Sequence, residues 1–177
     1  MTKPVRETGI VVLVVFAMTA LTGCGAVSHE AALLSTYVPE PGLRIDVGTV
    51  SNATGQTPKV DDEVVDIEQF LTDKLKEKLR AEDFLWSGAP ARKLVLTSKI
   101  IEYEPGDAFK RWLLPGWGAT ALGVEGELRD ESNAVVGTVR ARRTVAVGGV
   151  YTIGAWRNVF SSVADDIVSE LRSKIRK

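Results

Sequence analysis

The chain has 177 residues, of which 45% are hydrophobic and 25% charged, with a formal net charge of −1. This is the composition of one globular domain rather than of a disordered chain. A single cysteine and a single histidine exclude an intrachain disulfide and a zinc site built on a cysteine pair. Because 22 basic residues balance 23 acidic ones, the charge gives no reason to expect a nucleic-acid partner.

Residues 1–23 have the anatomy of a secretory signal peptide. Lys3 and Arg6 precede an unbroken apolar run from Ile10 to Met18, and a basic start before an apolar stretch of about 7–15 residues is typical of such signals. The run is shorter than the roughly 18 apolar residues of a membrane-spanning helix. A buried core helix is the alternative, but the run has no polar stripe. We therefore expect this segment to be removed.

The only cysteine follows directly after this run. The residues Leu21, Thr22, Gly23 and Cys24 resemble the lipobox of bacterial lipoproteins, with leucine three residues before the cysteine. The resemblance implies a diacylglycerol on the thiol, cleavage before Cys24 and an N-acyl chain on the new amino group, which is stable membrane anchoring. Gly25, in place of aspartate, implies sorting to the inner leaflet of the outer membrane, facing the periplasm, if the organism is Gram-negative. Beyond this covalent lipid we expect no cofactor and no metal.

The composition of residues 24–42 predicts a lipidated tether between the anchor and a folded domain. Its residues are mostly small or polar and include Pro39 and Pro41. A short helix around residues 30–34 is compatible with this composition. His29 falls within it, so we expect a solvated histidine rather than a catalytic one.

Residues 43–177 show the periodicities of a single periplasmic α+β domain. The expected elements are, in order, a strand at Leu43–Thr49, a helix through Val64, Ile67, Leu71, Leu75 and Leu79, a strand at Leu94–Tyr103, strands at Ala121–Arg129 and Val135–Val147, and a helix at Trp156–Ile175. A strand, a crossover helix and a second strand normally pair in parallel. The order strand-helix-strand-strand-strand-helix thus predicts a mixed, mostly antiparallel four-stranded sheet with two helices on one face.

Charged residues on the two helices predict solvated faces. The first helix should begin at the acidic run Asp61 to Glu63 and end among lysines, a polarity that complements the helix dipole. The lysines therefore indicate a solvent-exposed face rather than a binding site. The pair Asp165 and Asp166 in the last helix is expected to be solvated in the same way.

The sequence offers little for catalysis. The only cysteine is the expected anchor and the only histidine lies on the expected tether, so a Ser-His-Asp or Cys-His arrangement is excluded. Glu125 and Glu127 share a strand face about 7 Å apart, a spacing that glycosidase carboxylates also use. Alternate charges on a solvated sheet explain them as well, since Arg140 and Arg142 can meet them across the hairpin. We expect that the protein is not an enzyme.

The segment from Asp107 to Ala119 is unusual because basic and aromatic residues adjoin in it. Its candidate partner-binding residues are Lys110, Arg111, Trp112, Leu113, Leu114 and Trp117. One interpretation is that these side chains fold over the sheet and complete the core. The other is an exposed patch for a partner or for lipid headgroups, because tryptophan and arginine are enriched at interface hot spots.

Several of these features occur together in a known group of proteins. The run from Arg111 to Gly118, the hairpin from Val124 to Val139 and the Val147-Gly148-Gly149 break resemble an uncharacterised family of proteobacterial envelope lipoproteins, known only as a domain of unknown function. The layout is also similar, in fold alone, to small periplasmic domains of outer-membrane lipoproteins that assemble secretion pores or activate cell-wall synthases. Fold analogy does not transmit function, and the family supplies no catalytic residues.

The sequence therefore predicts where the protein is located and that it acts by binding. We expect an outer-membrane-anchored lipoprotein that is a non-catalytic accessory or assembly factor and binds a protein partner in the cell envelope. A homo-oligomer is compatible with this expectation. The alternative is a carrier or receptor for a small or lipidic ligand, which a deep apolar pocket would favour.

Overall fold

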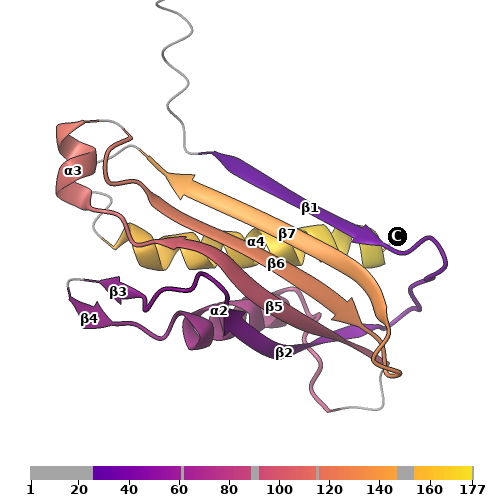
Figure 1. The fold of residues 1–177 in the computed structure, drawn as a ribbon. Coiled ribbons are helices and arrows are strands. Elements are labelled where there is room, and N and C mark those ends of the chain that lie inside the picture. The colour runs from indigo at the N-terminus through magenta and orange to yellow at the C-terminus, as the bar shows by residue number, and fades with distance from the viewer. Residues whose placement is uncertain (1–25, 61, 89–91, 115, 147–153, 177) are drawn as a thin grey trace, which may run out of the picture.

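The computed structural model describes residues 26–60, 62–88, 92–114, 116–146 and 154–176. The elements in chain order are β1 (Val27–Leu33), β2 (Arg44–Asn52), β3 (Lys59–Val60), β4 (Glu63–Val64), α2 (Ile67–Ala81), β5 (Lys93–Glu104), α3 (Ala108–Leu113), β6 (Thr120–Arg129), β7 (Val135–Val145) and α4 (Ala155–Ile175). Figure 1 shows α2 and α4 lying across one face of a single large sheet. The predicted α+β class, with both long helices on one face, is confirmed. Within these ranges no helix is long and apolar enough to cross a membrane.

The large sheet has five strands in the order β1-β7-β6-β5-β2. β2 and β5 pair in parallel, with α2 as the crossover between them. β5, β6 and β7 follow one another as antiparallel neighbours. The predicted parallel crossover and the predicted hairpin are therefore confirmed, whereas the predicted number of four strands is wrong.

The fifth strand is β1, which comes from the segment expected to be a tether. Its residues pair antiparallel with β7, from Val27 opposite Arg143 to Leu33 opposite Gly137. Residues 27–33 therefore belong to the sheet, and the prediction of a short helix around residues 30–34 is wrong. The strand is small and polar, and its weak alternation gives no signal of its own. Pairing with the backbone of β7 decides its conformation.

The core lies between the two long helices and the inner face of the sheet. α2 buries Ile67, Leu71, Leu75 and Leu79 at a spacing of four residues, which places them on one side of the helix. At one end of this layer an aromatic cluster joins the helices to β5. The ring of Phe160 on α4 lies 5.3 Å from that of Phe70 and 5.5 Å from that of Tyr103.

α2 begins later than the acidic run predicts. Its N-cap is Asp66, whose carboxylate accepts a hydrogen bond of 2.8 Å from the amide of Gln69. Asp62 and Glu63 of this run instead lie at the small β3–β4 hairpin. Val64, expected in the helix core, is 66% exposed there. Helical spacing alone did not locate the cap, because Val64 continues the apolar period without being part of the helix.

The expectation of a solvated acidic pair on α4 holds for only one of its members. Asp165 is exposed and lies 3.1 Å from Lys78 of α2. Asp166 is 6% exposed and accepts two hydrogen bonds of 2.6 Å from the guanidinium of Arg143 on β7. The carboxylate therefore ties α4 to the sheet, which no pattern along the helix indicates.

Candidate functional site

The segment expected to be a loop around Trp112 contains the short helix α3. Asp107 caps it, since its carboxylate accepts a hydrogen bond of 3.0 Å from the amide of Lys110. This backbone hydrogen bond is the main reason why the pKa of Asp107 lies below its ordinary value. α3 ends at Leu113, where the chain turns back towards β6. We call the described residues 107–114 and 116–118 the α3 loop.

A buried arginine holds the α3 loop in place. Arg111 is 3% exposed and donates hydrogen bonds of 2.7 Å to the carbonyl oxygen of Gly118 and 2.8 Å to Oγ1 of Thr120. The Thr120 hydroxyl in turn donates to the carbonyl oxygen of Pro105 at 2.9 Å. Burial lowers the pKa of Arg111, and the negative charge of Asp107 opposes this effect. Arg111 thus binds the loop from inside and is not part of its outer surface.

The close approach of Arg111 requires a glycine beside it. Gly106 has φ +72°, in the left-handed region, and a Cβ atom there would collide with Arg111 and Thr120. Glycine adopts this conformation at no steric cost. The turn before α3 and the position of Arg111 are therefore one structural unit.

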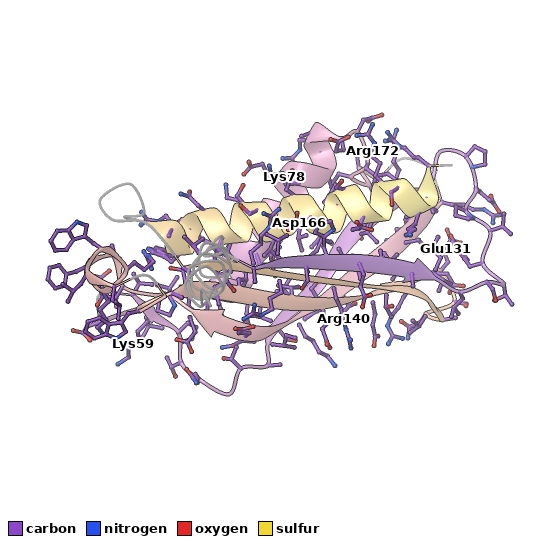
Figure 2. The ribbon with its side chains drawn as sticks, turned by 90° about the horizontal axis from the view of Figure 1, so that it is seen from above. Lys59, Lys78, Glu131, Arg140, Asp166 and Arg172 are labelled. Carbon is purple, nitrogen blue, oxygen red and sulfur yellow. The ribbon has the colours of Figure 1, made fainter. Side chains whose placement is uncertain are left out.

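The large apolar side chains of the α3 loop face solvent. The exposed fractions are 67% for Phe109, 65% for Trp112, 55% for Leu113, 59% for Leu114 and 49% for Trp117. The rings of Phe109 and Trp112 lie 5.9 Å apart. The interpretation that this segment completes the core is therefore wrong for these side chains. Figure 2 shows the side chains of α3 projecting away from the sheet at its end.

Lys110 supplies a positive charge to the outer surface of the α3 loop. Its side chain is 48% exposed, and Nζ lies 3.6 Å from the carboxylate of Asp107 and 5.9 Å from the centre of the Trp117 ring. Phe109 belongs to the same exposed cluster and was missed by the sequence argument. Its neighbourhood was the only available signal, because α3 places it beside Trp112. The candidate site thus keeps every predicted residue except Arg111 and gains Phe109.

The α3 loop lies at the same end of the sheet as the first described residue. The amide of Gly116 donates a hydrogen bond of 2.9 Å to the carbonyl oxygen of Ala146, directly after β7. Close by, near the end of β7, the amide of Thr144 donates at 3.0 Å to the carbonyl oxygen of Ala26. Figure 1 shows the start of β1 and α3 together at this end. The lipobox residues Leu21, Thr22, Gly23 and Cys24 lie outside the described residues.

The face of the sheet opposite the long helices forms a second candidate surface, which we call the open face. Figure 2 shows Arg140 on this side and Asp166 on the side of α4. Arg140 pairs with Glu125 at 3.0 Å, as predicted. Arg142 pairs instead with Glu102 of β5, through hydrogen bonds of 2.7 and 2.8 Å. Gly123 lies between them in register and leaves room for this contact.

One depression on the open face has a lining that is more polar than apolar. This depression of about 470 Å³ spans β1, β7, β6 and β5, and its charged or hydroxyl-bearing lining residues are Glu30, Thr97, Lys99, Glu125, Glu127, Thr138 and Arg140. The carboxylates of Glu125 and Glu127, which share this face, each lie in an ion pair, the second with Arg129 at 2.6 Å. The arrangement presents a charged surface on which these two carboxylates are matched by arginines.

The histidine has a structural contact. His29 is exposed, as expected of a solvated side chain. It lies in β1 rather than on a free tether, and its Nδ1 is 2.9 Å from a carboxylate oxygen of Glu170 on α4. Among the residues that the structure describes, no group of three or more histidine, cysteine or acidic side chains is placed to hold a metal ion.

Comparison with known families identifies the chain. The domain of unknown function DUF4410 matches residues 38–149. The chain belongs to this family. The resemblance to an uncharacterised family of unknown function is thus confirmed in its coarse form. No functionally curated protein matches this DUF4410 chain.

Solved structures of PelC share the fold. PelC from Paraburkholderia phytofirmans, a dodecamer, is 22% identical with a TM-score of 0.54, covering 82% of this chain and 97% of its own. A variant of PelC with one leucine changed to methionine, also a dodecamer, is 20% identical with a TM-score of 0.53 and the same coverage. A candidate lipoprotein from Caulobacter crescentus CB15 is 16% identical with a TM-score of 0.42, covering 73% of this chain and 86% of its own.

Proposed function

We propose that this DUF4410 protein is a lipid-anchored accessory or assembly factor of the outer membrane, which acts without catalysis by binding a protein partner in the periplasm. Two exposed surfaces carry this proposal: the α3 loop supports a role in binding, and the open face supports a protein as the partner. Five large apolar residues of the α3 loop are 49–67% exposed, whereas monomeric soluble proteins rarely leave large contiguous apolar patches in water. Such a surface supports a role in binding.

The open face supports a protein as the partner. Its ion pairs, such as Arg140 with Glu125 and Arg142 with Glu102, fix charged groups in place before any partner arrives. Protein interfaces outside their core are about as polar as the rest of a surface. A second copy of the chain is one candidate for this partner, because PelC, which has this fold, is a dodecamer.

The carrier alternative receives less support. A carrier for a lipidic ligand needs a concave, mainly apolar pocket. The depression of about 470 Å³ on the open face is instead lined by charged and hydroxyl-bearing side chains. The large exposed apolar residues of the α3 loop lie outside that depression.

The lipid anchor is tested by changing its cysteine. We expect Cys24→Ser to release the full chain from the membrane fraction, or to leave it unprocessed in the inner membrane, because three acyl chains supply the stable attachment. Membrane fractionation and mass spectrometry of the N-terminus are the measurements. An unchanged N-terminus and unchanged outer-membrane association would contradict the lipoprotein assignment.

Protein binding is tested by photo-crosslinking in living cells. A photoreactive residue in place of Thr138 or of Lys99, which both line the depression, should give a discrete adduct with another envelope protein or with a second copy. The same residue in place of Arg80, an exposed position on α2 on the other side of the sheet, is the matched control. Equal labelling from the open face and the control, or none from Thr138 and Lys99, would refute a protein partner on the open face.

A further inference from the structure

The start of the folded domain and the α3 loop are tied to one short stretch of chain. The backbone of Thr144 holds Ala26, and that of Ala146 holds Gly116. β1 and β6 flank β7 on either side, and neighbouring strands lie about 4.8 Å apart. The chain therefore enters the domain within roughly two strand spacings of the base of the α3 loop.

This position limits how far the exposed aromatic residues lie from the expected lipid. Cys24 precedes Ala26 by two residues, and two residues span at most about 7 Å. A lipid on Cys24 brings the bilayer surface to the end of the sheet that carries Trp112 and Trp117. The opposite end, where Trp86 lies beside Lys93 at the start of β5, points away from it.

The chemistry of the α3 loop matches the region between lipid headgroups and acyl chains. Tryptophan rings concentrate in this region because they combine an apolar body with a polar N–H group. Leu113, Leu114 and Phe109 add apolar side chains that are more than half exposed. Lys110 places a cation among them, and a lysine on an apolar surface keeps its ammonium group at the headgroups. Interfacial segments of proteins share this combination.

We infer that the α3 loop docks on the membrane surface that holds the lipid of Cys24, with Trp112, Leu113 and Leu114 entering the acyl boundary. The inference rests on the lipid anchor of the proposed function and is independent of the protein partner on the open face. Docking fixes the orientation of the domain, which a flexible acyl anchor alone leaves free. Arg111 positions the surface, because its hydrogen bonds to Gly118 and Thr120 hold the loop from inside.

The test is depth-dependent quenching of single tryptophans in the lipidated protein. The full mature protein is reconstituted in vesicles of phosphatidylethanolamine and phosphatidylglycerol whose acyl chains carry bromine near the headgroup. One variant keeps only Trp112 (W86F, W117F, W156F). The matched control keeps only Trp86 (W112F, W117F, W156F), so both share the two other substitutions and any effect of these on folding.

Membrane docking predicts a blue shift and loss of the larger part of Trp112 emission, with Trp86 emission unchanged. If the protein floats with the vesicles but Trp112 emission is not quenched, the docking inference is wrong, although the lipid anchor is supported. A blue shift of Trp112 without quenching overturns it as well, and indicates that a second copy covers the loop. Protein that does not float shows that the anchor itself, and hence the proposed function, has failed.

Discussion

Removing the carboxylate of Asp166 should destabilise the domain far more than removing its neighbour. Asp166 is buried, and both of its oxygens accept hydrogen bonds of 2.6 Å from Arg143. These bonds are the main reason why the pKa of Arg143 lies above its ordinary value. The pair joins the middle of α4 to β7, so its loss acts on the contact between helix and sheet.

The magnitude follows from the burial of the two partners. Breaking a fully buried pair costs about 3–5 kcal/mol, because the remaining charge is left unpaired. An exposed pair contributes about 0–1 kcal/mol. The side chain of Asp166 is 8% exposed but that of Arg143 is 33% exposed, so water partly replaces the lost partner. We expect Asp166→Asn to lower the free energy of unfolding by about 2 kcal/mol, or Tm by about 4–8 °C in a domain of this size.

Thermal and urea unfolding followed by circular dichroism measure this loss. Asp165→Asn is the matched control, because Asp165 is 66% exposed beside Lys78, and it should cost less than about 0.5 kcal/mol. Arg143→Met completes a double-mutant cycle, in which the two losses should be strongly non-additive. If Asp165→Asn and Asp166→Asn cost the same, the argument from burial is wrong.

Three further predictions concern a buried hydroxyl, the turn before α3 and the start of α2. Burial raises the pKa of Tyr103 to about 12, and its hydroxyl has no hydrogen-bond partner among the described residues. The unfolded chain therefore loses this proton at a lower pH than the folded chain does, so the wild-type free energy of unfolding should fall as pH rises from 10 to 12. Tyr103→Phe should match wild type at pH 7 and lose less unfolding free energy over that range in urea titrations; equal losses would count against this argument. Gly106→Ala should speed amide exchange across the α3 loop, because a Cβ atom collides with Arg111 and Thr120, while exchange in α2 and α4 stays unchanged; a protected loop would contradict this. Leu71→Ala should cost about 2–5 kcal/mol of unfolding free energy and Val64→Ser less than about 0.5 kcal/mol, since the first is 0% and the second 66% exposed; equal losses would place Val64 in the core after all.

Periodic hydrophobicity explains why the main elements were predictable. The stripe of Ile67, Leu71, Leu75 and Leu79 and the alternation in β6 reflect burial on one side of each element. The parallel pairing of β2 with β5 followed from the strand-helix-strand order, because a crossover helix returns the chain to the same end of the sheet. The pairing of Arg140 with Glu125 followed from hairpin register. In each case the signal lies within one element or between immediate neighbours.

Contacts between segments that are far apart in the sequence could not be predicted from these local patterns. β1 has no strong pattern and becomes a strand because β7, far along the chain, offers it an edge, as in the pairing of Ala32 with Thr138. Asp165 and Asp166 are identical side chains on one helix, and only the position of Arg143 separates an exposed carboxylate from a buried one. Arg142 pairs with Glu102 because Gly123, which lies between them in register, has no side chain to separate them.

The α3 loop shows the same division within the candidate site. The sequence by itself determined that basic and aromatic residues are concentrated between Asp107 and Ala119, and that a lipobox-like cysteine precedes the domain. Only the tertiary structure decided that Arg111 turns inward while Trp112 faces water, and that this surface lies at the end of the sheet where the chain enters. The physical reason is that a residue's type records its chemistry, whereas exposure depends on which distant backbone packs against it.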